Sequence, residues 1–326
     1  MGSITTRSYP GGHEHVTMGN LDEVSDLLGA HDCDVVWVDF DDPTKEELSH
    51  LAAELGLHHL AVEDALDPHQ RDKYVHYERH VFLVAHGVAL DVDAAELRTT
   101  ELHVFIGEQW MVTVHRGAID LIERIVQRWD KARRFAGTRI GVAVYSLLDV
   151  VVDGYFVAID RFEEFYEDAA DQVFGEHPIE PQAHRHWFEM RRSLNQFDRI
   201  VRPLTEAMST VVEQDLDHFG EESAPYLRDA EGELARASAE VESLRELVAH
   251  LVDANLVLRD YHQNQVMKKV TSWAAIIAVP TLVTGYYGMN VPFPGSGEPW
   301  GVATSTSVAL GCSGALYVTF RRKGWL

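Results

Sequence analysis

A stretch near the C-terminus reads VTSWAAIIAVPTLVTGYYGMN, residues 270–290, and contains no charged side chain. The uncharged run continues to Gly297, over 28 residues, and a second uncharged run of 22 residues extends from Pro299 to Phe320. A helix needs ~20 mostly apolar residues to cross the ~30 Å hydrocarbon core of a bilayer. The sequence therefore predicts a membrane helix at residues 270–289, a loop at 291–301 and a second membrane helix at 302–320.

The second run is the weaker of the two, because Thr and Ser side chains dilute it. Small and hydroxyl residues nevertheless suit close packing between helices in lipid. The alternative is a buried helical hairpin in a soluble protein, but uncharged segments of this length are rare in soluble cores. We therefore favour a membrane hairpin.

Basic residues flank this pair of helices on both outer sides. Lys268 and Lys269 precede it, Arg321, Arg322 and Lys323 follow it, and the loop contains neither Lys nor Arg. The positive-inside rule then predicts that the loop lies outside the cell membrane and that both termini, including the basic tail at 321–326, are cytoplasmic.

The charge of the chain divides in the same way. The 326 residues carry a net charge of -24, of which the last 57 residues contribute +2 and the first 269 contribute -26. No basic stripe interrupts the acidic part, so we expect no nucleic-acid partner. The two cysteines, Cys33 and Cys312, are too few for a disulfide framework or a multi-cysteine zinc module.

The part before the membrane helices is expected to be cytoplasmic and to begin with a disordered segment at residues 1–15, which has no signal-peptide core. Residues 16–117 read as a small α/β domain. Its predicted helix is Lys45–Leu55, and its strand-like runs are Val35–Phe40, Val81–Ala85, Leu102–Ile106 and Trp110–His115. Residues 118–223 show a helical period. The last helix, 224–290, would be about 65 residues or ~95 Å long at 1.5 Å per residue, and would continue from the cytoplasm into the membrane.

Positions three and four residues apart on this long helix form a seam of small residues within the membrane and polar residues below it. We refer to it as the seam: Gly285, Thr281, Ala278, Ala274, Thr271, Met267, Asn264, Asp260, Val257 and Asp253. Few of these are the Leu or Ile of a dry coiled coil. Two interpretations remain open, a wet pore made by several copies or a packing face against the second membrane helix.

The tetrapeptide Tyr287-Gly288-Met289-Asn290 closes the first membrane helix, and the chain ends Lys323-Gly324-Trp325-Leu326. With the loop and second helix between them, these motifs resemble the CorA family of magnesium transporters. The likeness extends to Pro225-Tyr226-Leu227-Arg228-Asp229 at the start of the long helix and to Asn264-Gln265-Val266-Met267-Lys268 just before the membrane.

The resemblance implies a funnel-shaped homopentamer in which a cytoplasmic α/β domain is followed by an all-α part, a stalk helix and two transmembrane helices. Gly288, Met289 and Asn290 would form its selectivity filter. Mg²⁺ sheds its waters reluctantly, so a ring of neutral carbonyl oxygens can hold the hydrated ion without trapping it. The alternative role for Asn290 is a helix C-cap.

The same resemblance implies roles for further residues. The pore lining would comprise Asp253, Asn264, Met267, Val270, Ala274, Ala278, Thr281 and Gly285. Asp64 and Asp229, with Glu63 as an auxiliary ligand, would bind a regulatory Mg²⁺ between neighbouring subunits and hold the pore closed. A bulky gating residue is common in the family where this chain has Ala278, and Glu298 is the only acid of its atypical outer loop. These two departures leave open where the main hydrophobic gate of the pore lies and what role Glu298 has.

The leading hypothesis is thus a Mg²⁺ influx channel, driven by the membrane potential, that can also pass Co²⁺ or Ni²⁺. The alternatives are a zinc transporter of the same superfamily and a non-conducting, membrane-anchored scaffold or sensor. None of the 18 histidines has the spacing of a zinc site. The chain also has no Walker motif and no motif for a nucleophile or an organic cofactor, so we do not expect an enzyme.

Overall fold

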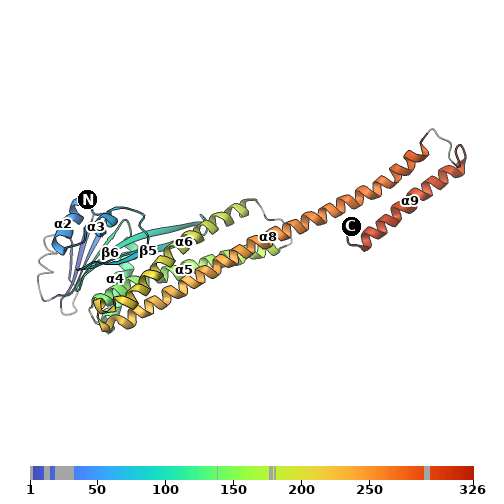
Figure 1. Ribbon diagram of the computed structural model, residues 1–326. Helices are drawn as coiled ribbons and strands as arrows, with labels where there is room; N and C mark the ends of the chain where they lie inside the picture. Colours follow the sequence, from blue (N-terminus) through green and yellow to red (C-terminus); the bar gives the residue numbers. More distant parts are fainter. Residues whose placement is uncertain are drawn as a thin grey trace. The chain divides into compact units, whose positions relative to one another are not determined.

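The computed structural model of the protein describes residues 3–10, 15–18, 33–137, 139–175, 179, 181–289 and 294–326 (Figure 1). The chain divides into two compact units, Met1–Ala249 and His250–Leu326. Helix α8, Ala224–Tyr287, is 64 residues long and contributes to both. The predicted long helix is therefore confirmed, although it ends at Tyr287 rather than at 290 and its residues up to Ala249 belong to the larger unit.

The larger unit contains a seven-stranded mixed sheet with the order β2-β1-β3-β7-β6-β5-β4. The pair β3 and β7 is parallel, and the other neighbours are antiparallel. The strands are β1 Ser3–Pro10, β2 His15–Met18, β3 Cys33–Asp41, β4 Lys73–His76, β5 Val81–Asp91, β6 Glu96–Ile106 and β7 Trp110–His115.

Two short helices, α2 Lys45–Leu55 and α3 His59–Leu66, pack on this sheet. Helix α2 starts where the sequence predicts it, because Thr44 and Glu47 form a capping box. It ends at Gly56, whose φ of 64° is the left-handed conformation that glycine adopts most readily. The apolar core beneath the two helices joins side chains of β3, β5, β6 and β7 to Leu48 and Leu51 of α2 and to Ala61 and Ala65 of α3.

The prediction that residues 1–15 are disordered is wrong for Ser3–Pro10, which forms strand β1. This strand pairs with β2 on one side and with β3 on the other. Its residue Tyr9 is fully buried and contacts the ring of Trp129 edge-on, with centroids 5.6 Å apart. Strand β1 lacks an alternating apolar pattern. It is held by its backbone pairing with β2 and β3 and by the contact of Tyr9 with Trp129.

Four helices follow the sheet, α4 Ile119–Ala136, α5 Ile140–Phe174, α6 Pro181–Gln214 and α7 Leu216–Phe219, and a 3₁₀ turn at Glu221–Ser223 leads into α8. Helix α5 is apolar enough to cross a membrane, but 78% of its most apolar window is buried inside the protein. It packs on the sheet, where the Tyr155 hydroxyl donates a 2.8 Å hydrogen bond to the carbonyl of His86. The apolar side chains of α5 thus form part of the core of the larger unit.

The first turns of α8 pack beside α5 and α6. Buried residues recur every three or four positions, at Leu227, Ala230, Leu234, Ala237, Val241, Leu244 and Val248. Arg245 of α8 pairs with Asp198 of α6 at 3.0 Å, and the Arg236 guanidinium lies 4.3 Å from the Phe156 ring centroid on α5. This part of α8 is consequently held by apolar contacts along one stripe.

In the smaller unit, the rest of α8 and helix α9, Pro299–Arg322, lie antiparallel (Figure 1). Helix α9 begins three residues before the predicted position and includes the end of the loop expected at 291–301. Glu298 is its N-cap residue and Pro299 occupies the first turn, where the missing N–H costs nothing. The helix also extends past Phe320 to Arg322, before Gly324 turns the chain with a φ of 68°.

Candidate ion pathway

The seam of α8 is exposed along its length in the smaller unit. Met267 of the seam and Val270, which is predicted to line the pore beside it, are each 60% exposed. The other seam positions from Asn264 to Gly285 are exposed as well. The seam therefore does not pack against α9 within one chain, so the second of the two interpretations, a packing face against that helix, does not fit this geometry. The first, a wet pore made by several copies, stays a prediction.

A different face of α8 contacts α9. Ser272 on this face is fully buried, and Ile276, Val279 and Val283 are partly covered. On α9 the corresponding face carries small residues: Ala309 is buried, and the Ser313 hydroxyl donates a 3.4 Å hydrogen bond to the Ile276 carbonyl. Small side chains let two helix backbones approach closely, as is typical of packing in lipid.

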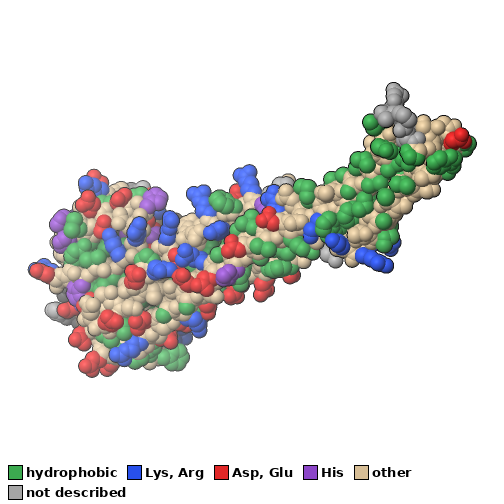
Figure 2. Space-filling view, turned by 45° about the vertical axis from the view of Figure 1, so that its right-hand side comes forward, with side chains coloured by type: hydrophobic (Ala, Val, Ile, Leu, Met, Phe, Trp, Pro, Cys, Tyr) green, Lys and Arg blue, Asp and Glu red, His purple; other side chains and the backbone are tan. Residues whose placement is uncertain are grey.

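The surface of this hairpin matches a membrane environment. The described helices α8 and α9 each contain a window long and apolar enough to span a bilayer, and only 6% and 11% of these windows are buried. The space-filling view shows a largely hydrophobic and uncharged surface over them (Figure 2). Exposed apolar surface of this extent is stable in lipid rather than in water.

The predicted filter begins where α8 ends. The Gly288 N–H donates to the Thr284 carbonyl at 2.8 Å, and the Met289 N–H donates to the Tyr286 carbonyl at 3.3 Å. A Cβ added at Gly288 would lie 3.0 Å from the Thr284 oxygen, closer than ordinary contacts allow. Glycine thus permits this tight turn, and Met289 is exposed beside it. Asn290 lies outside the described residues.

The three predicted regulatory residues do not meet within one chain. Asp64 on α3 accepts a 2.7 Å hydrogen bond from Lys73 Nζ, and Glu63 beside it is exposed. Asp229 on α8 accepts a 3.3 Å hydrogen bond from the Tyr145 hydroxyl on α5. The sequence did not predict the contacts of these two carboxylates with Lys73 and Tyr145.

Asp229 belongs to an acidic group at the start of α8. The pKa of Glu233 is raised by partial burial and then by the negative charges of Asp229, Asp149 and Asp153. Arg128 of α4 lies on the other side of Asp149, with Nη2 2.6 Å from Oδ1. Mutual repulsion of carboxylates favours uptake of a cation, whether a proton or a metal ion.

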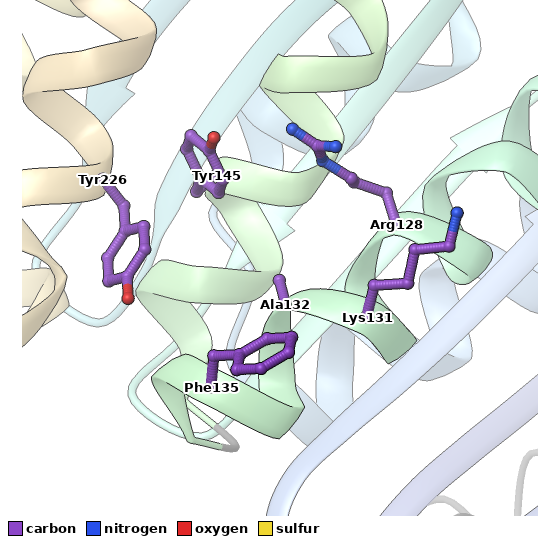
Figure 3. A pocket seen from close by; sticks show the side chains of 6 residues that line it. All are labelled: Arg128, Lys131, Ala132, Phe135, Tyr145 and Tyr226. Carbon is purple, nitrogen blue, oxygen red and sulfur yellow. The ribbon is translucent and has the colours of Figure 1, made fainter.

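A pocket of about 280 Å³ opens next to this group, within the larger unit. Helix α4 supplies most of its lining, together with one tyrosine from α5 and one from α8 (Figure 3). The rings of Tyr145 and Tyr226 lie 5.4 Å apart, and Phe135 at the rim is exposed. The lining residues are Arg128, Lys131, Ala132, Phe135, Tyr145 and Tyr226.

In the part of the chain that the structure describes, no group of three or more His, Cys, Asp and Glu side chains is arranged to hold a metal ion. The rings of the paired histidines His58 and His59 are tilted by 35° to each other, with centroids 4.5 Å apart, and His58 stacks on Tyr77 at 4.3 Å.

The chain is similar to known transport proteins over most of its length. It is 27% identical over 273 residues to the cobalt/magnesium transport protein CorA of Thermotoga maritima, covering 83% of this chain and 77% of the relative. It is 28% identical over 296 residues to the putative metal ion transporter YfjQ of Bacillus subtilis, covering 89% of each.

The fold is similar to that of a solved transporter. The complete structure of the CorA magnesium transporter from Methanocaldococcus jannaschii superposes with a TM-score of 0.80, covering 99% of this chain and 98% of that one at 20% identity. This likeness confirms the predicted fold, an α/β domain followed by a long helix that leads to a C-terminal helix. Residues 32–322 also match the family described as CorA-like Mg²⁺ transporter protein. The chain accordingly belongs to the CorA family of divalent cation transporters, which are membrane proteins and not enzymes.

Proposed function

We propose that this chain assembles as a homopentamer and conducts Mg²⁺ into the cell along the seam of α8. The observation that carries the proposal is the exposure of this seam from Asn264 to Gly285, on a face of α8 that α9 does not cover. Copies of α8 placed around an axis with this face inward would surround a pore of small and polar side chains. Met267 and Val270 would form its apolar constriction, which can close by dewetting.

Gly288, Met289 and Asn290 of each copy would form the outer selectivity filter. The described turn supports this role, because the chain leaves its helix at Gly288 and so releases carbonyl groups from helical hydrogen bonding. Neutral oxygens can replace outer-shell contacts of hydrated Mg²⁺, and they hold the ion less tightly than carboxylates would. Co²⁺ and Ni²⁺ are of similar charge and are expected to pass as well.

The membrane potential would drive the transport. At 100 mV, inside negative, inward movement of a divalent ion is favoured by about 4.6 kcal/mol, twice the ~2.3 kcal/mol for one charge. With both termini in the cytoplasm, the acidic larger unit would be on the cytoplasmic side of the membrane, where its negative field attracts cations.

Cytoplasmic Mg²⁺ would close the pore by binding between Asp64 of one subunit and Asp229 of the next, with Glu63 as an auxiliary ligand. Carboxylate oxygens suit this ion. Within its own chain, Asp64 accepts a hydrogen bond from Lys73, and Asp229 accepts one from Tyr145. Facing carboxylates repel unless a cation lies between them, so loss of Mg²⁺ would loosen the interface and shift the population toward the open state.

The experiment that tests the proposal uses liposomes that contain a Mg²⁺-sensitive dye and an imposed inside-negative potential. The wild-type protein should produce Mg²⁺ influx, and Asn290→Ala should abolish it. Asn255→Ala, a change on the same helix but away from the seam, serves as the matched control and should conduct normally. Absence of influx with the wild type, or equal influx with Asn290→Ala, would contradict the proposal. Influx of Zn²⁺ without Mg²⁺ would favour a zinc transporter instead.

A further inference from the structure

Proline 280 interrupts the hydrogen bonding of α8 inside the membrane-spanning part. It lies well within the helix, which continues for seven more residues to Tyr287. Proline has no backbone N–H, so the carbonyl four residues earlier, that of Ile276, loses its helical donor. In hydrocarbon no water replaces such a donor, and an unsatisfied carbonyl is costly.

The second helix supplies the missing donor. The Ser313 hydroxyl of α9 lies 3.4 Å from the Ile276 carbonyl oxygen, and this contact is partly buried. Four other hydroxyl groups of α9 donate hydrogen bonds to carbonyls of α9 itself, namely those of Thr304, Ser305, Thr306 and Thr319. Ser313 differs from these residues because its hydroxyl donates to α8, at the Ile276 carbonyl that lacks a helical donor because of Pro280.

A second hydroxyl acts beside it. The Thr281 hydroxyl, on the seam, bonds back to the carbonyl of Ile277 at 3.2 Å. Hydroxyl groups that bond back to the preceding turn tend to bend a helix. Two consecutive carbonyls, those of Ile276 and Ile277, are therefore engaged by side chains at the Pro280 turn, one from outside the helix and one from within it.

We infer that Ser313 is a positioning residue for conduction, because its hydroxyl holds the Pro280 turn of α8 and thereby fixes the direction of the segment from Thr281 to Met289. This segment carries the seam residues nearest the outer filter, so its direction sets the distance between copies of Gly288 and Met289. The inference rests on the proposed function. Ser313 itself does not touch the ion.

A double-mutant cycle tests this contact. In full-length protein in liposomes, Ser313→Ala should lower Mg²⁺ influx about threefold, the factor expected from an average hydrogen bond between membrane helices. Pro280→Ala restores the backbone N–H to Ile276, so the serine is no longer needed. In that background, Ser313→Ala should change influx by less than about 1.5-fold. Ser313→Thr, which keeps the hydroxyl, should conduct within about 1.5-fold of the wild type.

Melting temperatures measured on the same preparations give a readout that does not depend on transport. Ser313→Ala should lower the melting temperature in the wild-type background and leave it unchanged with Pro280→Ala. Ser305→Ala is the matched control, since the Ser305 hydroxyl bonds to Val302 of its own helix at 3.0 Å. It should show no coupling to Pro280.

Equal effects of Ser313→Ala in both backgrounds, in influx and in melting temperature, would overturn the inference, since a simple packing role is additive. If the wild type conducts no Mg²⁺ but the effect of Ser313→Ala on the melting temperature still depends on Pro280, the proposed function is overturned. The hydrogen bond between Ser313 and Ile276 is then still supported. The two failures are therefore distinguishable.

Discussion

Lys73 Nζ lies 2.7 Å from Asp64 Oδ2, so the carboxylate proposed to bind regulatory Mg²⁺ already has a cation within its own chain. Both side chains are about 30% exposed. Mg²⁺ would have to compete with this ammonium group for Asp64. The resting chain thus holds the carboxylate in an ion pair, and the Mg²⁺ concentration that closes the pore depends on the strength of that pair.

Replacing Lys73 should make closure more sensitive to Mg²⁺. Partly exposed ion pairs contribute ~0.2–1 kcal/mol, so Lys73→Met should lower the Mg²⁺ concentration for half-inhibition by about 1.5- to 5-fold. Influx at several internal Mg²⁺ concentrations measures this shift. Arg71→Met, a neighbouring exposed cation, is the control. A higher concentration for half-inhibition in Lys73→Met would show that Lys73 assists the site instead.

The Tyr145 hydroxyl should position Asp229 for the same regulation. Tyr145→Phe removes its 3.3 Å hydrogen bond to Asp229, together with the interactions of the hydroxyl with Asp149 and Arg128, and leaves the ring in place. A net hydrogen bond is worth ~0.5–1.5 kcal/mol, so the Mg²⁺ concentration for half-inhibition should rise about 2- to 10-fold. Asp229→Ala should remove inhibition. Tyr226→Phe, which changes the neighbouring ring of the pocket, should leave the inhibition curve unchanged, and a shift as large as that of Tyr145→Phe would point to a general packing effect.

The two faces of α8 should respond differently to the same substitution. Ala274 is exposed on the seam and Ser272 is fully buried against the rest of the chain. Ala274→Leu should lower conduction more than about tenfold with little change in melting temperature, since the added bulk enters the pore. Ser272→Leu overpacks a filled site at a cost of ~1–3 kcal/mol, so the melting temperature should fall. The reverse pattern would place the pore on the other face of α8.

The larger unit should lose stability in acid because of His80. Burial, followed by repulsion from His58, His218 and His76, lowers the pKa of His80 to about 4. In the unfolded chain a histidine takes up its proton near pH ~6.5. The unfolded state therefore binds more protons between these values, so stability is complete above pH ~6.5 and falls as the pH drops toward 4.

Thermal unfolding of the full-length protein between pH 7 and 4.5 measures this dependence. His80→Phe keeps an aromatic ring against Tyr77, whose centroid lies 5.1 Å away, and removes the titrating group. This variant should lose less stability on acidification than the wild type does. His59→Phe, at an exposed position, is the control. An unchanged pH profile in His80→Phe would assign the effect to other groups.

Local signals in the sequence predicted much of the fold. The absence of charge identified both membrane helices, and the helical spacing of Leu48, Leu51 and Leu55 predicted α2 at its observed bounds. Strand β1 was missed because Thr5-Thr6-Arg7-Ser8 shows no apolar alternation and is held by pairing with distant strands. The parallel pairing of β3 with β7 likewise joins residues more than 70 positions apart, such as Val38 and Val112.

The sequence predicted only the part of the candidate site that depends on local spacing. The residues of the seam follow from the helical period alone, and the structure places them on one exposed face of α8. The contacts of Asp64 with Lys73 and of Ser313 with Ile276 depend on how separate elements pack, and the latter pair is 37 residues apart. Side-chain partners across elements leave no period in a sequence, so they required the structure.

The proposed ion transport depends most directly on whether the seam faces the ion pathway. In a background of Cys33→Ala and Cys312→Ala, which removes both native cysteines, Ala278→Cys should be compared with Val279→Cys on the face that meets α9. Mg²⁺ influx into liposomes is measured before and after a positively charged, water-soluble thiol reagent. We predict that the reagent abolishes influx through Ala278→Cys and leaves Val279→Cys unaffected. Influx through Ala278→Cys that survives complete labelling would contradict a pore along this seam.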